Sequence, residues 1–169
     1  MHAENQLKIS EENYRSFAGL TSDYVHRCTR IGSAPFRLKW MGGSIGSISG
    51  YTPEEIFEKG CWLPFVHPDD REAISAYLFS LLPGDMKSID FRFIAKHGET
   101  RWISEKARCV AGEQEGELIL LGAATDITEK REVVEKLRES EELFRLFMRH
   151  TPVYTYIKRI EGSTSRVVQ

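Results

Sequence analysis

Cysteine is scarce in this sequence, and its spacing excludes the common metal-binding motifs. Cys28, Cys61 and Cys109 are the only cysteines among 169 residues. They lie far apart and form no Cys-x-x-Cys pair, so we expect no metal site. An odd number of scattered thiols suits a reducing compartment, which predicts a cytoplasmic protein. We interpret all three as core or surface thiols, because free cysteine is often buried.

Long apolar runs and an excess of charge are lacking as well. The longest apolar run, Leu118 to Leu121, is far shorter than the roughly 20 residues that a membrane-spanning helix needs. Residues 1–9 are polar and do not resemble a signal peptide. A net charge of −2 gives no general attraction to nucleic-acid phosphates or anionic lipid. We therefore expect no nucleic-acid partner and no membrane contact by this fragment.

A phosphate-loop motif is missing too. The glycine-rich run Met41 to Ser44 lacks the lysine and spacing of such a loop and is interpreted as a turn. The scattered His67, Asp69 and Asp70 are the only support for an enzyme. Carboxylates at the start of a helix explain them without a reaction. We expect no enzymatic activity in this chain.

What the sequence does contain is a globular composition, with 41% apolar and 28% charged residues. Its length allows one domain of ordinary size with something attached. Extended runs are predicted at 24–31, 36–41, 88–95, 101–110 and 117–125. In the second run Phe36, Leu38 and Trp40 alternate with polar residues, so these three are expected to share one buried face. The last run is apolar on both faces, so we expect a central strand in a sheet that is covered on both sides.

Helix signals separate the second and third extended runs. Thr52 is a predicted N-cap, with Pro53 at the first helical position and Glu55 placed to complete a capping box. His67 is interpreted as the residue that caps the helix opened by Pro68. That helix is expected to continue to about Leu82. Its apolar stripe contains Ile74, Tyr77, Leu78 and Leu81.

The end of the chain repeats its beginning at an offset of 130 residues. Nine identities occur over 24 aligned positions, starting with Ser10-Glu11-Glu12 against Ser140-Glu141-Glu142. A unit of this length is a domain in tandem array. We therefore expect a second copy that begins near Ser140 and is cut short, and hence a fragment of a longer protein.

A charged helix is predicted after the last strand. Asp126 with Glu129 fits a capping box at its start. Apolar residues then recur at coiled-coil spacing with polar interruptions at Ser140 or Glu141. They are Val133 or Val134, Leu137, Phe144, and Phe147 or Met148.

The order of these elements resembles the PAS family with its C-terminal PAC motif. The local matches are Gly50-Tyr51-Thr52-Pro53-Glu54-Glu55, Val66-His67-Pro68-Asp69-Asp70-Arg71, Gly98-Glu99-Thr100-Arg101-Trp102, Gly122 and Asp126-Ile127-Thr128. The resemblance covers about residues 10–130. It implies an α+β fold with a five-stranded antiparallel sheet of order 2-1-5-4-3, helices on one face, and flanking amphipathic helices.

The resemblance also suggests a division of the chain. We expect a disordered N-terminus at 1–9, an amphipathic helix at 10–22 and a PAS/PAC core at 23–128. A signalling or coiled-coil helix follows at 129–150, and 151–169 would be the truncated start of a second PAS domain.

Such domains sit in bacterial signalling proteins, so a sensory or regulatory module of the histidine kinase or diguanylate cyclase type is implied. Its output domain would lie elsewhere in the same chain, because residues 1–169 hold no His-Glu phosphoacceptor box and no Gly-Gly-Asp-Glu-Phe run. Asp126, Ile127 and Thr128 are the expected signal-transmission residues, at the point where the last strand meets the helix. The alternative is a ligand-free dimerisation scaffold, and a homodimer is expected in both cases.

A small-molecule ligand would lie between the helices and the sheet. The candidate wall residues are aromatic: Trp40, Tyr51, Trp62, Phe65, Tyr77, Phe91 and Phe93. They are equally able to fill the core without any ligand. Haem and flavin are both expected to be absent: residues 69–82 contain no histidine, and Gly60-Cys61-Trp62-Leu63 lacks the asparagine and glutamine of the family's flavin photosensors. Cys61 is interpreted as a packed thiol, and the cofactor remains unknown.

Overall fold

The computed structural model describes residues 22–150, 157–161 and 164–168. The chain forms two compact units, divided between Glu129 and Lys130, and each is described separately. The predicted disordered segment at 1–9 and nearly all of the predicted helix at 10–22 lie outside the described residues.

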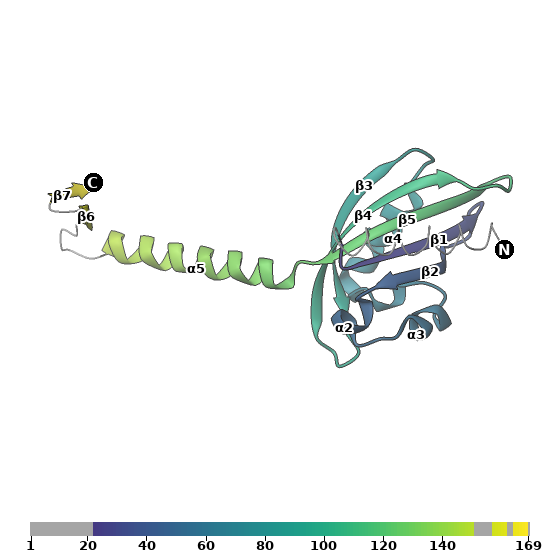
Figure 1. Cartoon of the computed structure of the whole chain (residues 1–169), viewed down its shortest axis with the longest axis horizontal. Coiled ribbons are helices and arrows are strands. Elements are labelled where there is room, and N and C mark those ends of the chain that lie inside the picture. The colour runs from purple at the N-terminus through teal and green to yellow at the C-terminus, as the bar shows by residue number, and fades with distance from the viewer. Residues whose placement is uncertain (1–21, 151–156, 162–163, 169) are drawn as a thin grey trace, which may run out of the picture. The chain divides into compact units, whose positions relative to one another are not determined.

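The first unit contains a five-stranded antiparallel sheet (Figure 1). Its strands are β1 (Tyr24–Ile31), β2 (Arg37–Gly43), β3 (Met86–Ile94), β4 (Thr100–Ala111) and β5 (Glu117–Asp126). Their order is β2-β1-β5-β4-β3, which confirms the predicted sheet. β5 is central, as its apolar run predicts. Leu120 is fully buried on the core side, whereas Leu121 on the opposite face is 36% exposed.

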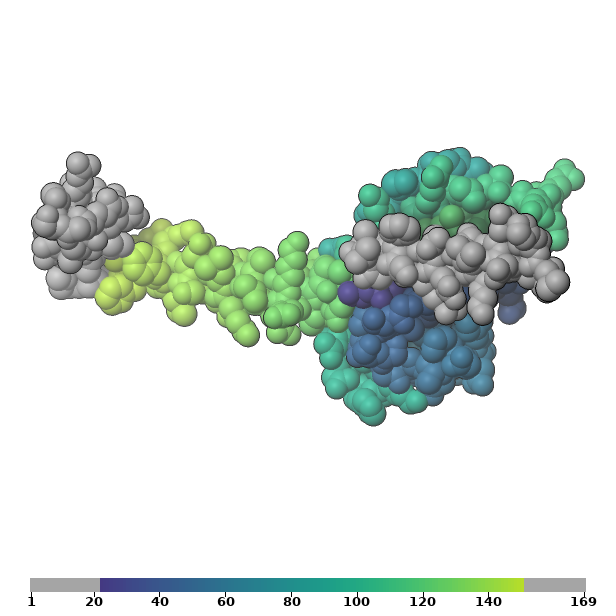
Figure 2. All heavy atoms as spheres, in the orientation of Figure 1, coloured from purple at the N-terminus to yellow at the C-terminus, as the bar shows by residue number. Residues whose placement is uncertain are grey.

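Short helices connect β2 to β3, and the first of them are drawn in blue in Figure 2. They are α2 (Ile45–Ser49), α3 (Pro53–Glu58), the 3-10 helices η1 (Leu63–Phe65) and η2 (Pro68–Asp70), and α4 (Arg71–Phe79). The capping box of α3 is confirmed. Thr52 Oγ1 accepts from the Glu55 amide at 3.3 Å, and Glu55 Oε2 accepts from the Thr52 amide at 2.9 Å.

The helix that follows His67 is shorter than predicted. His67 Nδ1 accepts from the Asp69 amide at 3.4 Å, so His67 caps η2 as expected. α4 ends at Phe79 and not near Leu82, because the Ser80 amide closes the last turn onto Ala76 and Tyr77. The predicted stripe still faces inward, with Ile74, Leu78 and Leu81 buried.

The prediction that Trp40 shares a buried face with Phe36 and Leu38 is wrong. β2 pairs Leu38 with Cys28 but Trp40 with Arg27, so Lys39 is an extra residue in a β-bulge. A bulge reverses the facing of the residues after it. Met41 therefore takes the core position opposite His26, and Trp40 lies on the other face, half-buried.

The second unit contains most of α5 (Thr128–His150) and a hairpin of β6 (Ile157–Glu161) and β7 (Thr164–Val168). At 1.5 Å per residue α5 is roughly 35 Å long. It begins one residue too late for the predicted capping box between Asp126 and Glu129, because Asp126 is then two positions before the first helical residue. The hairpin covers part of the predicted second copy, and that repeat remains a prediction.

Candidate functional site

A buried ionisable pair lies in the centre of the first unit. His26 on β1 and Glu105 on β4 both point from the sheet toward the core, and each side chain is 1% exposed. His26 Nε2 lies 3.3 Å from Glu105 Oε1. The contact is close but poorly aligned. Among the described residues, neither His26 Nε2 nor either carboxylate oxygen of Glu105 has a partner in hydrogen-bond geometry.

The sheet brings these residues together because β5 carries only small side chains between them. Gly122 pairs with His26 on one side and Ala107 on the other, and Ala124 pairs with Tyr24 and Glu105. A Cβ on Gly122 would lie 2.2 Å from His26 Nε2 and 2.4 Å from Cε1. The missing side chain of Gly122 therefore lets the imidazole cross β5 toward β4.

This arrangement is costly for stability, because a buried carboxylate loses its hydration and must recover it from partners. Most buried polar atoms in proteins have such partners. An incompletely satisfied ionisable pair at the centre of a core is therefore a candidate functional site.

The buried Glu105 carboxylate affects the pKa of two tyrosines. Burial raises the pKa of Tyr24 well above its usual value, and the charge of Glu105 adds to that rise. Burial and Glu105 likewise raise the pKa of Tyr77 to about 12. Tyr77 donates a hydrogen bond to the Lys87 carbonyl at 3.3 Å. Both phenols thus stay protonated near neutral pH.

The predicted aromatic wall falls into two stacked groups within the core. Trp62 stacks on Phe91 with centroids 5.2 Å apart, and its ring lies 5.7 Å from that of His26. Phe65 stacks on Phe93 at 5.7 Å and contacts Tyr51 at 4.6 Å. Of the seven predicted residues, Trp62, Phe65, Phe91 and Phe93 are buried, Tyr51 and Tyr77 pack against the core from its edge, and Trp40 lies on the other face.

Two thiols border the ionisable pair. Cys28 Sγ lies 3.5 Å from His26 Nδ1. The neighbouring Cys61 thiol, together with burial, raises the pKa of Cys28. The Cys28 thiol, two backbone amides and His26 lower the pKa of Cys61 to about 7. Within the described parts of the chain, no three His, Cys, Asp or Glu side chains are arranged to hold a metal ion.

The acidic cluster after His67 is structural. Asp70 accepts from the Arg92 guanidinium at 2.6 and 3.0 Å, and from the Arg92 amide at 2.9 Å. Arg92 accordingly lowers the pKa of Asp70. The pair ties η2 to β3, so Asp70 has a structural partner.

A second polar cluster lies where β5 meets α5. Asp126 Oδ1 accepts hydrogen bonds from the backbone amide and the hydroxyl of Thr128. Thr128 Oγ1 in turn accepts from the Trp102 amide at 2.8 Å, and the Ile127 amide donates to the Trp102 carbonyl at 2.8 Å. Asp126 thus contacts Thr128 directly, and β4 holds both Ile127 and Thr128 through Trp102.

The same cluster reaches β1 through Asp23, whose Oδ2 accepts from the Asp126 amide at 2.6 Å. The first turn of α5 is therefore tied to the two strands that carry His26 and Glu105. Only Asp126, Ile127 and Thr128 of this cluster were predicted from the sequence.

His26 and Glu105 were missed in the sequence analysis. The strand pattern contains a signal for Glu105, because it occupies an inward position between Ile103 and Ala107. For His26 the signal is the alternation of Tyr24, His26 and Cys28 along β1. A charged residue at an inward position is the exception that marks a site.

The chain matches the model of one protein family, described as the PAS fold, over residues 38–124, just over half of its length. An uncharacterized protein of Sinorhizobium fredii, y4lL, is 29% identical over 168 residues, or 95% of this chain and 19% of that protein. A protein of Brucella ovis named blue-light-activated histidine kinase is 31% identical over 84 residues, or 50% of this chain and 17% of that protein. The chain thus spans less than a fifth of the length of these relatives.

Solved structures share the fold at low sequence identity. The PAS domain of an HTR-like protein from Haloarcula marismortui superposes with a TM-score of 0.57 at 15% identity, covering 75% of this chain and 98% of that one. The N-terminal domain of a diguanylate cyclase with PAS/PAC sensor from Marinobacter aquaeolei gives 0.51 at 20% identity, covering 64% and 98%.

Proposed function

The chain belongs to the PAS fold family, and from that premise we propose that it is the sensory module of a longer signalling protein. The buried pair of His26 and Glu105 is the observation that carries this proposal. A domain that only needed to be stable would gain from apolar residues at these positions. The pair instead makes the core responsive to a bound molecule.

The ligand would be a small molecule with hydrogen-bond donors. Both oxygens of Glu105 are buried acceptors without an aligned partner in the described residues. A donor group on a ligand would satisfy them, and Trp62 stacked on Phe91 would offer an apolar wall beside it. Tyr51, Phe65, Tyr77 and Phe93 would complete that wall. Trp40 lies on the opposite face and is left out of the proposed site.

Flavin and haem fit these residues poorly. Residues 22–150 contain no asparagine, and their one glutamine, Gln114, is exposed in the turn between β4 and β5. The side chains that the family's photosensors use to hold flavin are therefore missing. α4 carries no histidine for a haem iron. His26 is already in contact with Glu105 and Cys28.

The signal would leave the core through Asp126, Ile127 and Thr128. These residues share hydrogen bonds with β1 and β4, the two strands that carry His26 and Glu105. A shift of either strand would change the bonds that hold the first turn of α5.

The output domain would lie in the same chain and be of the histidine kinase or diguanylate cyclase type. The protein would act in the cytoplasm, which suits its unpaired thiols. Among the described residues, no helix combines the length and hydrophobicity needed to span a bilayer.

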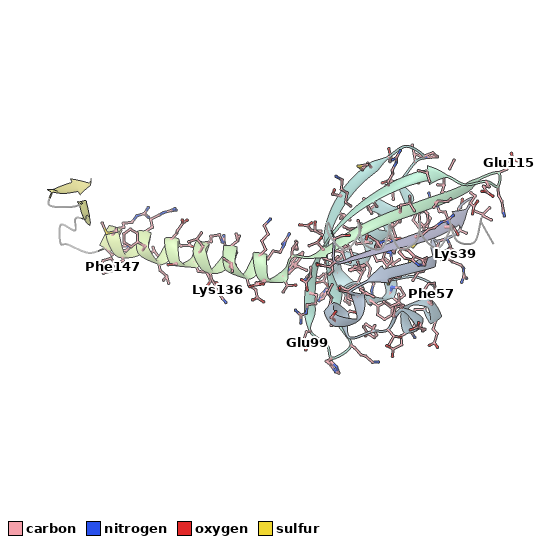
Figure 3. The ribbon with its side chains drawn as sticks, in the orientation of Figure 1. Lys39, Phe57, Glu99, Glu115, Lys136 and Phe147 are labelled. Atoms are coloured by element: carbon pink, nitrogen blue, oxygen red, sulfur yellow. The ribbon has the colours of Figure 1, made fainter. Side chains whose placement is uncertain are left out.

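A dimerisation scaffold is the second candidate, and the exposed face of α5 favours it. Val134, Leu137 and Phe144 are 57–60% exposed and follow the three-four spacing of a coiled-coil seam, with Glu141 between them. The side chains of α5 project along its whole length in Figure 2, and Lys136 and Phe147 mark two of them in Figure 3. A second copy of this helix is the partner that such a seam fits.

Native mass spectrometry of the 169-residue chain tests the two candidates together. The sensory proposal predicts an added mass on each subunit that is lost in E105Q, which keeps the shape of the side chain but removes its charge. E115Q is the matched control, because Glu115 lies exposed in the β4–β5 turn (Figure 3). Added mass that survives in E105Q would place the ligand elsewhere and contradict the proposed site.

A dimer at the bare sequence mass would favour the scaffold. A monomer without added mass would contradict both candidates.

A further inference from the structure

Cys28 and Cys61 come from distant parts of the chain and meet beside His26. Cys28 pairs across the sheet with Leu38, and the Leu38 amide donates to the Gly60 carbonyl at 2.9 Å. Cys28 belongs to the buried core cluster and Cys61 packs against it. The two thiols are close enough for each to shift the pKa of the other. Trp62, the next residue, contacts the His26 ring. Neither thiol is in a disulfide.

The two thiols differ in accessibility. Cys28 is fully buried, whereas Cys61 is partly exposed in the segment between α3 and η1. A small oxidant can therefore reach Cys61 before Cys28. The third thiol, Cys109, lies buried on β4 and is not part of this cluster. A pair of one accessible and one buried thiol is the arrangement of a redox-active dithiol.

We propose that Cys28 and Cys61 form a dithiol that hydrogen peroxide oxidises to a disulfide within the domain. This inference goes beyond the ligand-sensing function, because it requires neither a bound molecule nor the charge of Glu105.

The reaction takes two steps. The Cys61 thiolate attacks one oxygen of hydrogen peroxide, the O–O bond breaks, and a sulfenic acid and hydroxide form. Cys28 then attacks the Cys61 sulfur, the S–O bond breaks, and the disulfide forms as water leaves. His26 Nδ1, 3.5 Å from the Cys28 sulfur, takes the Cys28 proton and returns it to the departing hydroxide, which leaves as water. In total two thiols lose two electrons and two protons, and one peroxide is reduced to two waters.

The disulfide would join β1 to the helical layer. Because β1 also carries His26, and Asp23 at its start binds the Asp126 amide, the crosslink would fix the strand that leads to the first turn of α5. Oxidation would thus act on the same strand as the proposed ligand, but through the thiols of Cys28 and Cys61 and not through Glu105.

Peptide mapping of the full chain tests the proposal without a variant. After treatment with hydrogen peroxide and blocking of the remaining thiols, a non-reducing digest is expected to contain one peptide pair, with Cys28 joined to Cys61. The pair should disappear on reduction. A disulfide that includes Cys109, a link between two chains, or Cys61 recovered only as sulfinic acid would overturn the proposal.

Alkylation by iodoacetamide supplies a second readout that does not depend on the disulfide. The rate at Cys61 should rise with pH with a midpoint near 7, the pKa that its neighbours give it. C28A removes the thiol that lowers the pKa of Cys61 most, so the midpoint should move upward toward the ordinary thiol value of 9.0. C109A is the matched control and should leave the midpoint near 7. An unchanged midpoint in C28A would contradict the pairing of the two thiols.

Discussion

Gly122 lies against the His26 imidazole so closely that a Cβ added to it would meet Nε2 at 2.2 Å. The imidazole cannot yield freely, because Trp62 and Glu105 border it on other sides. The glycine therefore sets where the histidine lies, and the contact between β1 and β4 depends on it.

G122A should destabilise the domain by about 1–3 kcal/mol, the usual cost of an additional methyl group in a filled core. Urea unfolding at neutral pH measures this change. G46A is the matched control, because a Cβ on Gly46 in α2 meets nothing closer than 3.7 Å. That control should be neutral or slightly stabilising, since alanine favours a helix. Equal stability of G122A and the parent chain would show that His26 moves without cost.

Removal of the His26 side chain should expose the cost of the buried carboxylate. We expect H26L to lower the free energy of unfolding by about 3–5 kcal/mol, because Glu105 then lacks its closest polar group. In H26L/E105Q the loss should be smaller than in H26L alone, since a neutral amide is easier to bury. A double-mutant cycle by urea unfolding measures the coupling. R27L, at the next and outward-facing position of β1, should change stability by less than about 0.5 kcal/mol. Additive effects would contradict a coupled pair.

The fold and this site differ in how far the sequence predicts them. Strand positions follow from the local alternation of apolar and polar residues, and Thr52 with Glu55 marks a helix start within four residues. Both features can therefore be predicted from a few consecutive residues. The bulge at Lys39 is not, because one extra residue reverses Trp40 and Met41 without changing the apolar content of the strand.

The contact of His26 with Glu105 is even harder to predict from local sequence patterns. Each residue is an exception in its own strand, but their meeting requires the register of β5 with both β1 and β4. Gly122 matches a family motif in the sequence. The need for glycine at this position becomes clear only from the structure, in which the His26 imidazole packs against it. The bonds of Thr128 with Trp102 likewise join residues that no sequence period relates.

Acid should weaken the tie between η2 and β3. Arg92 holds the pKa of Asp70 below its ordinary value of 3.8. A lowered pKa in the folded state means that the stabilisation is present above 3.8 and is lost as the pH falls through the folded-state value. D70N should therefore lower the free energy of unfolding by about 1–2 kcal/mol at neutral pH. The loss is smaller than for a buried ion pair, because Asp70 and Arg92 are partly exposed.

The difference in the free energy of unfolding between D70N and the parent chain should narrow as the pH falls below 3.8 and through the lowered folded-state pKa of Asp70. Urea unfolding at neutral and at acid pH checks this. D69N is the control, because the Asp69 side chain is 70% exposed and only reaches Arg92 at 3.4 Å. Parallel pH profiles of D70N and the parent would contradict the assigned role of the ion pair.

The start of α5 should loosen when the Thr128 hydroxyl is removed. T128V keeps the shape of the side chain but removes the acceptor for the Trp102 amide and the donor to Asp126. A partly buried amide left without its partner costs about 1–3 kcal/mol. Hydrogen exchange at the Trp102 amide should therefore become faster in T128V, and the Ile127 amide, which donates to the Trp102 carbonyl, should follow. T128S keeps the hydroxyl and should restore slow exchange at both amides. If the T128V and T128S amides exchanged alike, the hydroxyl would not hold the helix to β4, and Thr128 would lose its place in the proposed relay.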